Sequence, residues 1–161
     1  MQLTWWQMLV GIGAALAANH FLIKRIYESV RDDIVAGYPD GVLPAPPGFD
    51  PAHWSAELVR RTPGGEWQGR FEVVIYAGAL LTQQWPLAAS WLAFKLGSKW
   101  KSWTTTWEAT SPRPQADQDE RAAIARAHYA RAGLDHRLFV VGTAGNIVAG
   151  AIGLVAARLL T

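Results

Sequence analysis

Charged side chains are missing from three long stretches of this chain. Residues 3–23, 73–94 and 138–157 contain no Asp, Glu, Lys or Arg, although these residue types make up 17% of the sequence. At about 1.5 Å of rise per residue, a helix over any of these stretches would cover the roughly 30 Å hydrocarbon core of a bilayer. Buried helices of a soluble bundle are the alternative, but such helices usually keep a polar stripe. The pattern therefore predicts an all-α membrane protein with two or three transmembrane helices and one integral membrane domain over 1–161.

The first apolar stretch continues as an amphipathic helix. Ile26, Val30 and Ile34 keep helical spacing among charged neighbours, and Gly37 is a suitable stop. We expect one helix over 4–36, whose last turns carry an apolar stripe that needs a partner.

The connection that follows, residues 37–70, is rich in proline. Its turn-forming residues indicate extended or looping chain. Asp50 and Pro51 are suited to be the cap and the first residue of a short helix. We expect this helix to end at residues 62–65, which contain proline and glycine.

The second apolar stretch is interrupted in its middle by the sequence Thr82-Gln83-Gln84-Trp85-Pro86. The segment 71–96 is therefore either one span kinked at Pro86 or a re-entrant pair of half-helices. Its length favours a single span. In both cases Gln83 and Gln84 are costly toward lipid, so we expect them to face protein, a cavity or a bound group.

The chain after this stretch, residues 97–135, is expected to form an interfacial segment and then a surface helix. Trp100, Trp103 and Trp107 would share one helix face, while Asp117 begins a capping box and Gly133 is the expected stop. Short amphipathic or interfacial helices therefore lie in the connections. The last helix is expected over 137–160.

Tryptophans lie where these spans would meet the headgroups. Indole rings favour this boundary because one side is apolar and the other wet. The candidate interface anchors are Trp5, Trp6, Trp100, Trp103 and Trp107.

Small residues recur at four-residue intervals in the first and last apolar stretches. Such rows let helix backbones approach closely in lipid. We expect the two helices to pack along Gly11, Ala15 and Asn19 on one side and Gly145, Ala149, Gly153 and Ala157 on the other.

The positive charges bear on orientation. If 71–96 spans once, Lys and Arg divide almost evenly between the two faces. If it re-enters, every Lys and Arg except Arg158 lies on one face. In both arrangements we expect the first connection to be cytoplasmic and the N-terminus outside, in a bacterial inner membrane.

Catalytic motifs are not evident. The chain has no cysteine, its four histidines lack metal-ligand spacing, and no dense run of Lys or Arg points to nucleic acid. We therefore expect no enzyme, and we predict no cofactor. His20 is the one candidate ligand for haem or a chlorophyll-type pigment.

The leading functional hypothesis is a non-catalytic accessory subunit of a larger integral membrane complex, for example a respiratory or photosynthetic one. Its partners would be other integral membrane subunits and the lipid bilayer. The alternatives are a small homo-oligomeric channel or holin-like pore lined by Gln83 and Gln84, and a pigment- or haem-binding subunit that uses His20.

Overall fold

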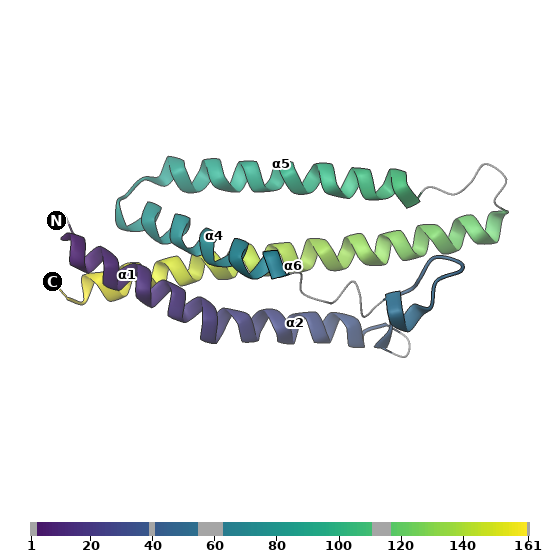
Figure 1. Cartoon of the computed structure of the whole chain (residues 1–161), viewed down its shortest axis with the longest axis horizontal. Helices are drawn as coiled ribbons and strands as arrows, with labels where there is room; N and C mark the ends of the chain where they lie inside the picture. The colour runs from purple at the N-terminus through teal and green to yellow at the C-terminus, as the bar shows by residue number, and fades with distance from the viewer. Residues whose placement is uncertain (1–2, 39–40, 55–62, 111–116, 161) are drawn as a thin grey trace. The chain divides into compact units, whose positions relative to one another are not determined.

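The computed structural model describes residues 3–38, 41–54, 63–110 and 117–160, with the side chains of 63–66 and 101–110 left out of the description. Every long regular element in these ranges is helical. The helix α1 (Trp5–Ala18) runs through a π-helical segment, η1 (Asn19–Ile23), into α2 (Lys24–Ala36). The helices α4 (Pro63–Leu81), α5 (Trp85–Thr110) and α6 (Gln118–Arg158) follow (Figure 1).

The chain divides into two compact units. We call the first, Met1–Glu28 with Arg61–Lys95 and Phe139–Thr161, the apolar unit. The second, Ser29–Arg60 with Leu96–Leu138, holds most of the charged residues and is called the charged unit. Several helices begin in one unit and end in the other, so each unit combines distant parts of the sequence.

The first helix covers the range expected from its caps. The side-chain oxygen of Gln7 accepts hydrogen bonds from the backbone N–H of Thr4 at 2.7 Å and from its hydroxyl at 2.8 Å. At the other end, the N–H of Gly37 donates to the carbonyl of Asp33 at 3.2 Å. These bonds satisfy backbone groups that a helix end leaves without an intrahelical partner.

The middle apolar segment is a helical hairpin. Helix α4 ends at Leu81 and α5 begins at Trp85, so of the two arrangements expected for 71–96 the structure has two helices joined by a turn and not one kinked helix. Gln83 takes a positive φ of 58°, which few residues other than glycine adopt, and reverses the chain. Pro86 then lies in the first turn of α5, where its missing N–H has no partner to lose.

The two arms of the hairpin run antiparallel within the apolar unit. The ring of Phe71 on α4 meets that of Trp91 on α5 edge to face, with centroids 5.6 Å apart. Leu81 packs beside Gly11 of α1, and Gln7 donates to the carbonyl of Leu160 at 3.4 Å. The turn therefore lies at the same end of this unit as the first and last turns of the chain (Figure 1).

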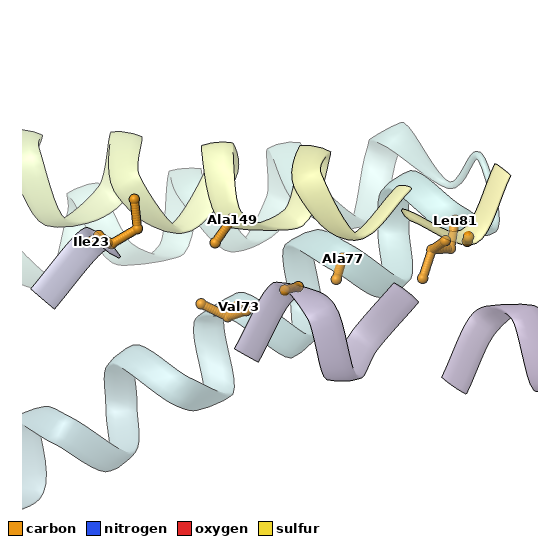
Figure 2. Packing of buried hydrophobic residues seen from close by; sticks show 7 residues of the cluster. Ile23, Val73, Ala77, Leu81 and Ala149 are labelled. Carbon is orange, nitrogen blue, oxygen red and sulfur yellow. The ribbon is translucent and has the colours of Figure 1, made fainter. Parts of the chain in front are cut away.

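The core of the apolar unit is built mainly from small side chains of α1, α4 and α6. Gly11 and Gly153 approach so closely that a Cβ on Gly11 would lie 2.9 Å from the carbonyl oxygen of Gly153. A Cβ on Gly150 would meet the backbone nitrogen of Ala77 at 3.1 Å. Figure 2 shows the buried cluster between these helices: Ala15, Ile23, Val73, Ala77, Leu81, Ala149 and Ala157.

The charged unit has its own small core, which supplies the partner that α2 needs. Leu43 of the proline-rich connection is buried with Ala130 and Leu134 of α6. Ile34 of α2 packs against this cluster. The apolar stripe of α2 is therefore covered in part by this chain itself.

The helix α6 joins two elements that were expected to be separate, the surface helix that ends at Gly133 and the last helix over 137–160. It begins after Asp117, whose carboxylate accepts the N–H of Glu120 at 2.7 Å, but it continues through Gly133 to Arg158. Glycine inside a helix costs only about 1 kcal/mol relative to alanine. The neighbouring Leu134 is 1% exposed, and burying such a side chain contributes about 1.5–3 kcal/mol, so packing outweighs the local preference.

The structure also places the start of α4 where a helix was expected to end. Pro63 is its first residue, a position at which proline is favoured. The short helix after Asp50 is described only for residues 51–54, and its expected end lies outside the described residues.

Two helical stretches in the described chain are long and apolar enough to cross a bilayer. They are Trp5–Ala36, which joins α1 to α2, and Gln118–Arg158, which is α6.

Candidate functional site

A buried ion pair joins the two arms of the α4–α5 hairpin. Lys95 Nζ lies 2.6 Å from Glu72 Oε2, and the two residues are 7% and 2% exposed. Glu72 precedes the turn by about as many residues as Lys95 follows it, so the antiparallel arms bring them to the same level. Both belong to the apolar unit.

Three further polar side chains complete what we call the polar cluster. Lys95 also donates to the hydroxyl of Thr143 at 2.8 Å. The side-chain amide of Asn146 donates to the same oxygen of Glu72 at 2.8 Å, and its own oxygen accepts a bond from Asn19 at 2.7 Å. One connected network therefore runs from η1 through α6 to α4 and α5.

The aromatic ring of Phe139 adds a contact of a different kind. Its centroid lies 4.9 Å from Lys95 Nζ, within the range in which the ring quadrupole attracts a cation. The ammonium is therefore surrounded by a carboxylate oxygen, a hydroxyl oxygen and an aromatic face.

The energetics of the cluster follow from its burial. Removing a charged group from water costs several kcal/mol, and only a close partner with further hydrogen bonds offsets that cost. Glu72 and Lys95 provide this for each other, and Asn146 and Thr143 add hydrogen bonds to them. Each buried charge is therefore stabilised by the other. These contacts also hold α5 against α4 and α6.

Tyr76 lies one helical turn after Glu72 and is 2% exposed. Its hydroxyl has no hydrogen-bond partner in the part of the chain that the structure describes. A buried hydroxyl without a partner is unfavourable by about 1–3 kcal/mol. The indole N–H of Trp91, one turn before Lys95, is a second buried polar group without a partner among the described residues.

The arrangement can hold helices together through its ion pair and hydrogen bonds. The ion pair is buried and its members bond to each other. Among the described residues there is no group of three His, Cys, Asp or Glu side chains that could hold a metal ion. The cluster can fix four helical segments in one register.

The predicted helix-packing residues lie on both sides of the contact between α1 and α6. Gly11 meets Gly153, and Ala15 also lies close to Gly153. Asn19 contributes a hydrogen bond to this contact, and Gly145 lies against Ile23. Two further members of the row, Ala149 and Ala157, are fully buried.

Gln83 and Gln84 do not lie inside the bundle. Both are exposed at the hairpin turn, so the described part of the chain provides neither the protein contact nor the cavity that we expected for them. The reason is the reversal at Gln83, which moves the two amides from the middle of an apparent span to its end.

His20 is exposed on η1, with its ring edge to face against Phe21 at 4.8 Å. The assignment of a haem or pigment to it stays a prediction. Of the expected interface anchors, Trp5, Trp6 and Trp100 are exposed, and the side chains of Trp103 and Trp107 lie outside the described residues.

The pattern of charged and apolar residues did not predict the ion pair. Glu72 and Lys95 are the first charges on either side of the uncharged stretch 73–94, and they therefore read as its edges. The available signal was their equal spacing from Gln83 and Gln84, which becomes meaningful once a turn is placed there.

In comparisons with known proteins, no family model, curated protein or solved structure matches this chain.

Proposed function

We propose that this chain is a non-catalytic structural subunit of a larger integral membrane complex. The observation that carries the proposal is that few side chains of α5 are buried by this chain. Among the described side chains from Trp85 to Trp100, Lys95 alone is buried. Four others, Ala88, Trp91, Leu92 and Lys99, are half-buried, and the remaining ones are exposed and available to lipid or to another protein.

The exposed face of α5 has the composition of a membrane helix contact. Ala89, Ala93 and Gly97 follow one another at four-residue intervals, all three are exposed, and nothing lies within 4 Å of a Cβ built on Gly97. In lipid, helices associate by close backbone approach at such rows, because burial of apolar surface provides no driving force there. This supports a partner helix along α5.

Membrane insertion is the second part of the proposal. The apolar unit would lie in the bilayer, with its exposed leucine, valine and aromatic side chains toward lipid. The buried Glu72–Lys95 pair is compatible with this position because ionisable groups inside a membrane bundle are normally paired.

The hairpin suggests the orientation. If the turn lies on one side of the bilayer, the connections before α4 and after α5 lie on the other, and residues 24–70 and 95–137 hold every Lys and Arg except Arg158. Cytoplasmic connections carry an excess of these residues, so we assign both connections to the cytoplasm and the N-terminus to the outside of a bacterial inner membrane.

The test is to isolate the protein from its native membrane with a mild detergent and to measure the mass of the intact assembly. We expect this chain together with other membrane subunits, and we expect Ala93→Leu to release them. Val155→Phe is the matched control because Val155 is an exposed position of α6. A monomer that carries no other protein would contradict the proposal.

A further inference from the structure

The surroundings of Lys95 Nζ match what a primary ammonium group requires. Such a group has three N–H donors and no acceptor. Glu72 Oε2 and Thr143 Oγ1 accept two of its hydrogen bonds, at 2.6 and 2.8 Å. The Phe139 ring, 4.9 Å away, adds attraction for an organic cation. The bond to the carboxylate is charge-assisted and therefore the strongest of these contacts.

The same surroundings are poorly suited to a hard metal cation. Ions such as Ca²⁺ and Mg²⁺ require six or more oxygen ligands. The side-chain oxygen of Asn146, which could have been one of them, already accepts a hydrogen bond from Asn19. Its amino group donates a hydrogen bond to Glu72 and so helps to hold the carboxylate in place. An amino group cannot serve as an oxygen ligand to a metal.

The carboxylate is held in place independently of Lys95. Asn146 is 5% exposed and bonds directly to Glu72 Oε2, while Asn19 fixes the orientation of the Asn146 amide. Glu72 and Asn146 lie on α4 and α6, and these helices contact each other at Gly150 and Ala77. These contacts do not involve the lysine side chain, so they can still hold the carboxylate when it is removed.

We propose that Glu72, Thr143 and Phe139 form a binding site for a primary ammonium group inside the apolar unit, and that Lys95 is its tethered occupant. Lys95 belongs to α5, and it is the one buried residue among the described side chains of that helix. Occupancy of the site by Lys95 therefore attaches α5 to α4 and α6. This inference concerns the internal chemistry of the chain and does not depend on the proposed subunit role.

The experiment replaces the tethered cation with a free one. Lys95→Ala removes three methylenes and the ammonium, and n-propylammonium supplies the same atoms. The purified variant in detergent is heated in n-propylammonium chloride, sodium chloride or tetramethylammonium chloride at equal ionic strength. We expect n-propylammonium to raise its unfolding temperature in a saturable manner and to recover at least half of the loss relative to the unsubstituted protein. Sodium and tetramethylammonium have no N–H donors, so neither should raise the unfolding temperature in this way.

The double variant Glu72→Gln/Lys95→Ala is the control, because it lacks the carboxylate that the amine would bind. It should show no selective response to n-propylammonium. The yield of folded protein on dilution from denaturant, measured in each salt, provides a second readout if Lys95→Ala does not fold in sodium chloride.

Several results would overturn the proposal. Equal stabilisation by sodium and n-propylammonium would show that the site does not select an ammonium. An equal response of the double variant would show that Glu72 is not involved. A failure of n-propylammonium to restore either stability or refolding would leave Lys95 as an ordinary partner of Glu72, with no site for its headgroup.

Discussion

Lys95 Nζ lies 2.6 Å from Glu72 Oε2, across a hairpin that carries no other charged residue between them. The contact places two opposite charges together in the interior of an apolar bundle, and the pair has no net charge. Asn146 and Thr143 of α6 bond to the two partners. The position of the α4–α5 hairpin on α6 therefore depends on charged and polar side chains as well as on apolar packing.

The ion pair predicts a strong dependence between two substitutions. Glu72→Gln or Lys95→Met alone should lower the free energy of unfolding by about 3–5 kcal/mol, because each leaves a buried charge unpaired. The double variant should lose clearly less than the sum of the two single losses. The measurement is a denaturant titration in micelles. Arg25→Met at an exposed position serves as the control and should change stability by less than about 0.5 kcal/mol. Additive losses would contradict the structure.

The close contact between α1 and α6 predicts opposite effects at two glycines. Gly153→Ala would push a methyl group against the carbonyl of Gly11, and it should lower stability by about 1–3 kcal/mol. Gly13→Ala has open space around it and should be neutral or stabilising by up to about 1 kcal/mol. Thermal unfolding of the two variants compares them directly. Equal effects would mean that α1 and α6 do not meet at Gly11 and Gly153.

Much of the helical structure could be predicted because local signals decide it. Gly37 and Asp117 lie at helix ends, where cap residues are expected. The rows that contain Gly11 and Gly153 were visible as periodic small residues. The hairpin could not be decided, because Pro86 is equally compatible with a kink inside one helix and with the first turn of a new one.

The remaining features depend on tertiary contacts. Glu72 and Lys95 are far apart in sequence, and nothing local indicates that their side chains meet. The stop expected at Gly133 was wrong because Leu134 is buried in a cluster with Leu43, and this packing favours a continuous helix. Both misses concern contacts between distant parts of the chain.

The continuity of α6 gives a simple prediction. Gly133→Ala should stabilise the protein by about 0.5–1 kcal/mol, because alanine loses less backbone freedom in a helix and nothing lies within 4 Å of the added Cβ. Circular dichroism during thermal unfolding checks both helicity and stability. If a helix ended at Gly133 in a left-handed cap, the same substitution would be destabilising instead.

Asp135 of the charged unit predicts a dependence on pH. Burial raises the pKa of this carboxyl, although Arg131 and Lys99 oppose the effect. The folded state therefore favours the protonated acid, so its contribution to stability is present below the ordinary pKa of aspartate and is lost as pH rises through the raised value. Asp135→Asn should be more stable than the unsubstituted protein at neutral pH. Its advantage should disappear toward about pH 4. An advantage that grows on acidification would contradict this assignment.

Orientation in the membrane tests the central proposal, an apolar unit that is inserted as a hairpin with both connections on one face. Single cysteines at Gly48, Gln83 and Asp119 can be labelled with a membrane-impermeant maleimide in intact cells and in inverted vesicles, since the chain contains no cysteine of its own. We predict labelling of Gly48 and Asp119 only from the cytoplasmic side and of Gln83 only from the outside. Labelling of Gly48 and Asp119 from opposite sides would contradict the hairpin insertion.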